Sequence, residues 1–116
     1  MGRVYTRDEL LAEVAAGSGN LCDVSSNGDF RRFTDDRVFR FAVAFLWLRL
    51  AEPTCQLVTR RMVDDQSRRA WEGMCGIRNL LAHDREQDID FDELWYEIPS
   101  TLKHTDAELG RLLLAE

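Results

Sequence analysis

An arginine and a histidine five residues apart are the side chains of this 116-residue chain best suited to chemistry. Arg78 is followed directly by Asn79, and His83 comes just before a strongly polar run. A guanidinium can hold a phosphate through two parallel hydrogen bonds, and an imidazole titrates near neutral pH, so it can accept or donate a proton. Arg78 and His83 are therefore candidate catalytic residues for cleaving RNA without a metal ion, with Asn79 as a supporting group.

The spacing alone does not place these two side chains together. Five residues of unbroken helix turn through about 140°, so Arg78 and His83 share a face only if the helix ends between them. The polar segment 84–88 predicts such an end. A structural role stays open beside the catalytic one, because an arginine in a helical protein is often held in an ion pair and a histidine often caps a helix end.

Apolar residues at helical spacing predict an all-α domain over residues 1–116, with four to five helices and no strand. A capping box at Thr6–Glu9 begins the first helix, which the segment 17–20 weakens or interrupts. The second helix runs over 38–52 behind a cap supplied by residues 34–36. Pro53 kinks or ends this helix, because proline has no backbone N–H to donate.

The third helix carries the candidate site. Asp65 or Ser67 caps it, and Arg78 falls on the same stripe as four apolar residues, Trp71, Met74, Cys75 and Ala82. An arginine on such a stripe is either paired inside an interface or lines a site. A further helix opens with the acidic residues at 90–93, and a second capping box at Thr105–Glu108 begins a short tail helix.

The second helix is apolar nearly all round. Two sets of residues cover it, one stripe of Phe41, Ala42, Phe45 and Leu48 and a remainder of Val43, Leu46, Trp47 and Leu50. A helix of this kind must bury more than one face. In a chain this small we expect the second face to meet another copy of the chain, so a homodimer is predicted.

Composition excludes several kinds of protein. The net charge of −6 argues against binding nucleic acid through a broad positive field. Fourteen of the 15 cations are arginine, which indicates either phosphate recognition or the codon bias of a GC-rich genome. Cys22, Cys55 and Cys75 are an odd number at unrelated spacings, so we expect free thiols rather than a disulfide, and neither a metal site nor a cofactor.

The sequence also predicts where the protein works. Its longest apolar run, residues 41–48, is eight residues long, far short of the roughly 20 that span a bilayer. The first residues lack the hydrophobic segment of a signal peptide. We therefore expect a cytoplasmic protein with no membrane partner.

A longer pattern surrounds the candidate pair. Its residues are Trp71, Met74, Gly76-Ile77-Arg78-Asn79, Leu81 and His83, followed by Ile89-Asp90 and Leu94-Trp95, and preceded by Phe33, Asp36-Arg37, Ala42 and Ala51-Glu52. This pattern resembles the HepT-like branch of the HEPN superfamily, over roughly residues 30–102. The resemblance implies a HEPN-like up-and-down helix bundle, usually dimeric.

The same resemblance implies an activity. HepT-like toxins are metal-independent endoribonucleases that use an Arg-x4-His motif, which here is Arg78 and His83. They form HepT/MntA-type toxin–antitoxin pairs with a nucleotidyltransferase partner, which transfers AMP to a tyrosine two residues after the motif histidine. That position is Arg85 here, so AMP transfer onto it is chemically impossible. Arg85 is instead a candidate phosphate contact.

Two functions follow from this pattern. The first is a ribonuclease toxin that acts at the cleft of a homodimer. The alternative is a non-catalytic helical module that binds a nucleotidyltransferase-type partner and keeps Arg78 and His83 as structural residues. The negative charge and the missing tyrosine favour the alternative, whereas the retained Arg–Asn–His combination favours the ribonuclease.

Overall fold

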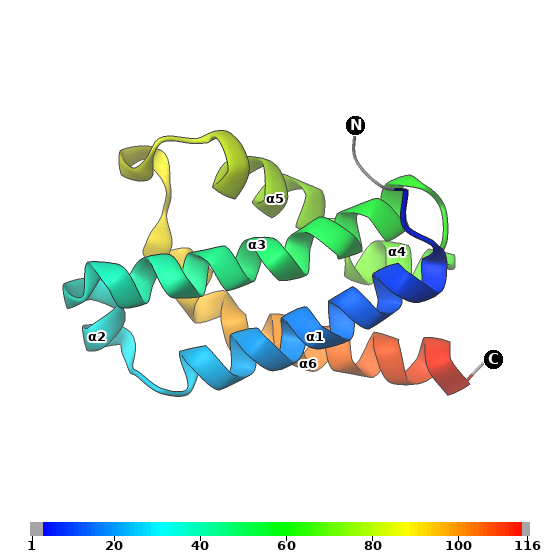
Figure 1. Ribbon diagram of the computed structural model, residues 1–116, viewed down its shortest axis with the longest axis horizontal. Helices are drawn as coiled ribbons and strands as arrows, with labels where there is room; N and C mark the ends of the chain where they lie inside the picture. Colours follow the sequence, from blue (N-terminus) through cyan, green and yellow to red (C-terminus); the bar gives the residue numbers. More distant parts are fainter. Residues whose placement is uncertain (1–3, 115–116) are drawn as a thin grey trace.

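The computed structural model describes residues 4–114, and all regular structure in that range is helical (Figure 1). Its elements are α1 (Arg7–Ser25), α2 (Phe30–Asp35), α3 (Arg37–Thr59), α4 (Asp65–Ala70), α5 (Met74–His83), the 3-10 turn η1 (Glu86–Asp88) and α6 (Phe91–Leu114). The all-α prediction is confirmed. The α-helices number six rather than four to five, because α2 is additional and the predicted third helix is divided into α4 and α5, while the predicted tail helix is part of α6.

The central helix of the fold is α3. It packs against α1 on one side and α5 on the other, while α6 packs against α1, α2 and α4 (Figure 1). Trp47 of α3 is completely buried, and its indole N–H donates to the backbone oxygen of Leu94 in α6 at 3.1 Å. The helix α3 therefore contributes much of the core, and it also supports α5, the helix that carries the candidate site.

Two faces of α3 differ in burial. The residues that enter the core are Phe39, Val43, Trp47, Leu50, Ala51 and Leu57. Phe45 lies on the opposite side with 59% of its surface exposed, and Val38 and Phe41 are exposed as well. By length and composition alone α3 could cross a membrane, but the core helix of a soluble protein meets the same two criteria.

The predicted helix starts are mostly correct. Thr6 and Glu9 form the expected capping box of α1. Asp36 caps α3, and the backbone N–H of Phe39 lowers the pKa of its carboxyl. The cap of α4 is Asp64, however, rather than Asp65 or Ser67. The predicted third helix is also two helices, because the chain leaves helical geometry at residues 71–73 before α5 begins.

Residues expected to weaken or end a helix do not end one at three places, because tertiary packing outweighs the local cost. The helix α1 continues through Gly17, which is buried where α1 crosses α3. The helix α3 continues through buried Pro53 to Thr59. The helix α6 is continuous from Phe91 to Leu114, so the second capping box, at Thr105–Glu108, is wrong. Thr105 and Glu108 are instead buried positions within the helix.

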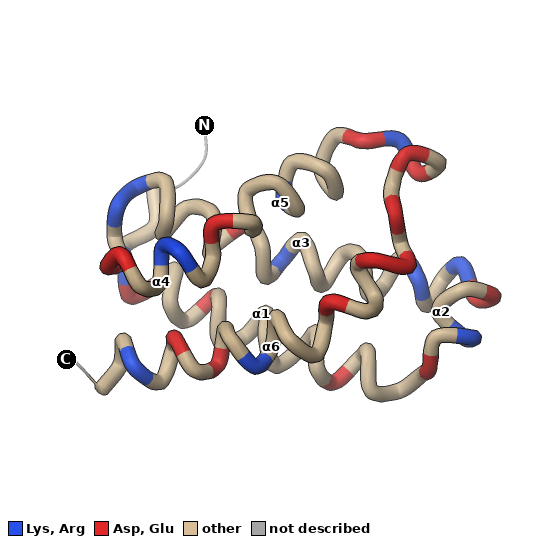
Figure 2. Tube along the Cα trace, turned by 180° about the vertical axis from the view of Figure 1, so that it is seen from behind, with Lys and Arg blue, Asp and Glu red and all other residues tan. Residues whose placement is uncertain are grey.

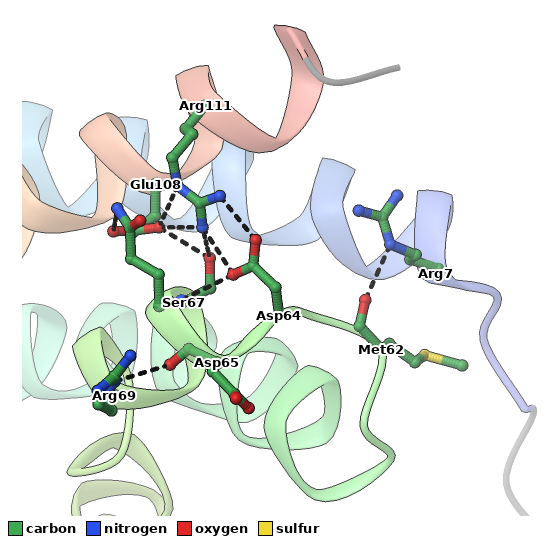
Figure 3. A network of polar contacts seen from close by, with 9 residues as sticks. Arg7, Met62, Asp64, Asp65, Ser67, Arg69, Glu108 and Arg111 are labelled. Atoms are coloured by element: carbon green, nitrogen blue, oxygen red, sulfur yellow. Dashed lines mark hydrogen bonds and ion pairs between the residues drawn. The ribbon is translucent and has the colours of Figure 1, made fainter.

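A network of charges fastens α4 to the far end of α6 (Figure 3). Arg111 donates to both carboxylate oxygens of Asp64, at 2.7 and 2.8 Å, and to Ser67 and Glu108 at 2.7 and 2.8 Å. These bonds lower the pKa of Asp64 well below its usual range. Burial raises the pKa of Glu108, but hydrogen bonds from Arg111 and Ser67 outweigh it, so the net direction is downward. The network fixes the segment that leads into α5.

Candidate active site

The helix α5 is held against the fold by one side only. Its apolar residues Met74, Ile77, Leu80 and Leu81 recur at helical spacing and pack on the core, and α3 is its main packing partner. Its N-cap residue is Gly73, which has no side chain to cap the first N–H groups of the helix. The helix ends where Asp84 turns into extended backbone. The side of α5 away from α3 is therefore open to solvent.

Arg78 is anchored at the junction of α5 and α3. Its Nε donates to Glu52 at 2.9 Å and its Nη1 donates to the side-chain oxygen of Asn79 at 2.9 Å. The Arg78 and Glu52 side chains are 39% and 41% exposed. The Nη2 of Arg78 donates to no residue within 4–114. The guanidinium is thus oriented by two acceptors and keeps donors free for an anion from solvent.

His83 is the last residue of α5 and is exposed. It has no hydrogen-bond or ion-pair partner in the described part of the chain. The prediction that the helix ends between Arg78 and His83 is wrong, because regular α-helix continues to His83 and the N–H of Asp84 still donates to Leu80. The two side chains therefore leave α5 in directions about 140° apart.

The other two candidate residues are placed differently. Asn79 is exposed and accepts from Arg78, so it supports the arginine rather than the histidine. Arg85 lies in the connection after α5, where its Nε pairs with Asp88 at 3.2 Å. Glu86 ties that connection to α3 through Arg37, at 3.0 Å. The hydrogen bond from Arg37 lowers the pKa of Glu86.

The expectation of free thiols is wrong for two of the three cysteines. Cys55 of α3 and Cys75 of α5 form a disulfide, with their Cα atoms 4.8 Å apart, while Cys22 is free and exposed. Spacing along the chain gave no sign of this pair, because the contact depends on how α3 and α5 pack. Among residues 4–114, no group of three or more His, Cys, Asp or Glu side chains is placed to hold a metal ion.

Glu52 is the functional neighbour whose role sequence reasoning missed. Its contact with Arg78 can be recognised only once the Cys55–Cys75 pair is known. Glu52 precedes Cys55 by three residues and Arg78 follows Cys75 by three, so a single antiparallel pairing of the two helices makes both contacts. The disulfide and the ion pair therefore belong to one register of α3 against α5.

An apolar hollow lies beside the C-terminal end of α5. It has a volume of about 300 Å³ and is lined mainly by α3 and the connection after α5, including Phe41, Phe45, Leu48, Leu81 and Phe91. Asp84, the residue after His83, also lines it. The exposed aromatic face of α3 is thus continuous with the end of the helix that carries the histidine.

The region therefore contains an anchored arginine and an exposed histidine that leave α5 in different directions, and an uncovered aromatic face of α3 that reaches the end of α5. Residues of α3, α5 and α6 form this region. Comparison of the chain with protein-family models, with curated proteins and with solved structures gives no match.

Proposed function

We propose that this chain is a metal-independent endoribonuclease with a HEPN-like bundle, the cytoplasmic toxin of a HepT/MntA-type toxin–antitoxin pair. The observation that carries the proposal is the contrast between the two motif residues on α5. Arg78 is oriented by Glu52 and Asn79 with donors left over, whereas His83 is exposed and unpartnered within residues 4–114.

The chemistry follows from these positions. His83 accepts the proton of a ribose 2′-OH, and the oxygen attacks the adjacent phosphorus. The P–O5′ bond breaks, and the departing oxygen takes up a proton from a protonated imidazole or from water, which restores the proton balance. The free donors of Arg78 hold the phosphate oxygens and offset the charge that grows on them in the transition state. The products are a 2′,3′-cyclic phosphate and a 5′-hydroxyl end.

The divergence of the two side chains on α5 favours a site made by two copies of the chain. One copy alone points Arg78 and His83 in directions about 140° apart. The uncovered face of α3, with Phe41 and Phe45, ends at the hollow beside α5. A homodimer formed through this face brings two copies of α5 together, so that the residues of both line one cleft.

The experiment measures cleavage of purified RNA in EDTA by the wild type and by His83→Ala and Arg78→Ala. We expect each change to lower the rate about 100-fold or more, with cyclic-phosphate ends on the wild-type products. His104→Ala is the matched control, because His104 is the other histidine of the chain and lies exposed on α6. Equal cleavage by the wild type, His83→Ala and Arg78→Ala would mean contamination and would contradict the proposal.

A second function is favoured by the charge distribution. Acidic residues gather along the connection between α5 and α6 and in the first turn of α6 (Figure 2). Such a surface suits a basic face of a protein partner better than RNA. In this alternative the chain is a non-catalytic module that binds a nucleotidyltransferase-type partner. It predicts that Arg78→Ala lowers the melting temperature, by loss of the Glu52 contact, in a protein that cleaves no RNA.

The partner of either function is a nucleotidyltransferase-type antitoxin. Arg85 has no hydroxyl group, so transfer of AMP to that residue is not the means of neutralisation. The Arg85 side chain is paired with Asp88 on the surface and remains available to a phosphate only if that exposed ion pair opens. Exposed pairs of this kind open at little cost.

A further inference from the structure

The strongest attachment of the catalytic helix to the fold is covalent. The disulfide joins α3 to α5 at Cys55 and Cys75, and one helical turn further along the same interface Glu52 meets Arg78 at 2.9 Å. The two contacts join the same two helices and lie about one helical turn apart. Arg78 is therefore held by a bond and an ion pair that share one register.

The other attachments of α5 are weaker. Met74 is its only buried residue, and Ile77, Leu80 and Leu81 are partly buried. Its N-cap lacks a side-chain bond. The ion pair from Arg78 is about 40% exposed at both side chains, and exposed pairs contribute little by themselves. Without the disulfide, the position of α5 depends on one apolar stripe and on two exposed ion pairs, Arg78–Glu52 and the Arg37–Glu86 pair that follows the helix.

We propose that Cys55 and Cys75 form a redox site that sets the position of Arg78. In the oxidised form the disulfide holds α5 so that Arg78 lies against Glu52 in the orientation that receives phosphate. Reduction by a dithiol releases α5, and Arg78 loses its fixed orientation. Disulfides in reducing compartments are usually transient or regulatory, which fits a chain that works in the cytoplasm. The effect on activity rests on the proposed ribonuclease function.

The chemistry of the switch is ordinary thiol–disulfide exchange. Both cysteines are partly exposed, so a thiolate from solvent can approach a sulfur. The thiolate of a dithiol attacks one sulfur, the Cys55–Cys75 bond breaks, and a mixed disulfide forms. The second thiolate of the dithiol then displaces the protein sulfur. Two electrons and two protons pass to Cys55 and Cys75, and the dithiol becomes a disulfide.

The first arm of the test needs no RNA. Amide hydrogen exchange is measured on the full chain, oxidised with glutathione disulfide or reduced with dithiothreitol. We expect the amides of α5 to exchange about tenfold faster or more after reduction, through local opening, and to lose more protection than those of α1 and α6. No loss of protection in α5, or the same loss in every helix, would overturn the proposal.

The second arm measures RNA cleavage in EDTA under the same two conditions. We expect the reduced protein to be about tenfold slower or more, because a displaced catalytic group loses much of its effect. Cys55→Ser/Cys75→Ser is expected to be slow in both conditions, after circular dichroism has shown that it folds. Cys22→Ser is the matched control and is expected to respond to dithiothreitol as the wild type does.

The two arms separate this proposal from the proposed function. Faster exchange in α5 after reduction, with no RNA cleavage by any form, would contradict the ribonuclease. It would still support a redox site at Cys55 and Cys75 that holds α5 in position. RNA cleavage that depends on His83 but is equal in the oxidised and reduced protein would leave the ribonuclease standing and overturn the redox control of Arg78.

Discussion

Arg111 is the residue on which the junction of α4 and α6 depends. It bonds to Asp64, Ser67 and Glu108, which come from two separate helices (Figure 3). Ser67 and Glu108 are buried, and a buried carboxylate is tolerated only with a charged partner and hydrogen bonds. The contacts with Arg111 therefore compensate the cost of burying Glu108 and connect α6 to the segment that leads to the candidate site.

The charge of Asp64 gives this junction a pH dependence. Its folded pKa is lowered by Arg111, so the stability it contributes is present above its ordinary value of about 3.9 and is lost as the pH falls through and below that value. We expect Asp64→Asn to melt below the wild type at pH 7, and the gap to narrow towards pH 3. Asparagine caps a helix as well as aspartate does, so the change removes mainly the charge.

Thermal unfolding followed by circular dichroism between pH 7 and pH 3 measures that gap. The matched control is Asp65→Asn, because Asp65 is the next residue and forms only a more exposed pair with Arg68 at 3.5 Å. A gap for Asp64→Asn that is equally wide at pH 3 and pH 7 would show that its effect is not electrostatic.

At the scale of elements, the crossing of α1 and α3 explains why two similar glycines differ. A Cβ at Gly17 would lie 3.1 Å from the Cα of Leu50 and 3.2 Å from the backbone oxygen of Arg49, whereas a Cβ at Gly19 would meet nothing within 4 Å. The neighbours of Gly17 are backbone atoms, which cannot rotate away. Gly17 is therefore what lets α1 approach α3 closely.

Replacing each glycine by alanine tests this explanation. We expect Gly17→Ala to lower the free energy of unfolding by about 1–3 kcal/mol, because the core is overpacked. Gly19→Ala is expected to raise it by about 0.5–1 kcal/mol, since alanine costs less entropy than glycine in a helix. Urea unfolding of the two variants beside the wild type measures both values. A stabilising Gly17→Ala would mean that the helices separate easily.

The same contrast shows which parts of the fold could be predicted from the sequence. The caps at Thr6 and Asp36 were predictable, because a cap depends on residues within one turn. Whether α1 continues past Gly17 and α3 past Pro53 could not be decided from the sequence, because the energy that overrides the local cost comes from the packing of distant segments. Propensity is a weak guide wherever such packing decides.

The candidate site also has a part that could be predicted from the sequence and a part that could not. Arg78, Asn79 and His83 are neighbours in the sequence, so their types and order could be recognised. Glu52 and the disulfide partner Cys55 belong to another helix, and their roles depend on the register of α3 against α5. No local pattern contains that register.

At the scale of the whole molecule, the uncovered face of α3 is the feature that a single chain does not explain. Phe45 is 59% exposed, and Val38 and Phe41 are exposed on the same helix. Phe45 forms a ridge between two surface hollows, since it lines both of them. An exposed ridge between two hollows suits the packing of a second, identical helix, ridge into groove. This is the face through which we expect two copies to associate.

Sedimentation of the wild type at micromolar concentration is expected to give about twice the 13.4 kDa mass of the chain. Phe45→Glu buries a charge in the interface and is expected to weaken association about tenfold or more. The matched control is Leu113→Glu, since Leu113 is similarly exposed, at 54%, but lies at the end of α6. A wild type that sediments as a monomer would contradict a site shared between copies.

The disulfide between α3 and α5 also acts on the chain before it folds. Cys55 and Cys75 are 20 residues apart and enclose the whole of α4, so the crosslink removes many conformations from the unfolded ensemble. A loop of this length is worth about 3 kcal/mol in chain entropy. The oxidised protein is therefore expected to melt at a higher temperature even if its native structure is unchanged. In the unfolded chain the crosslink keeps the segments that form α3 and α5 close together. It therefore lowers the entropy cost of bringing these two segments into contact during folding.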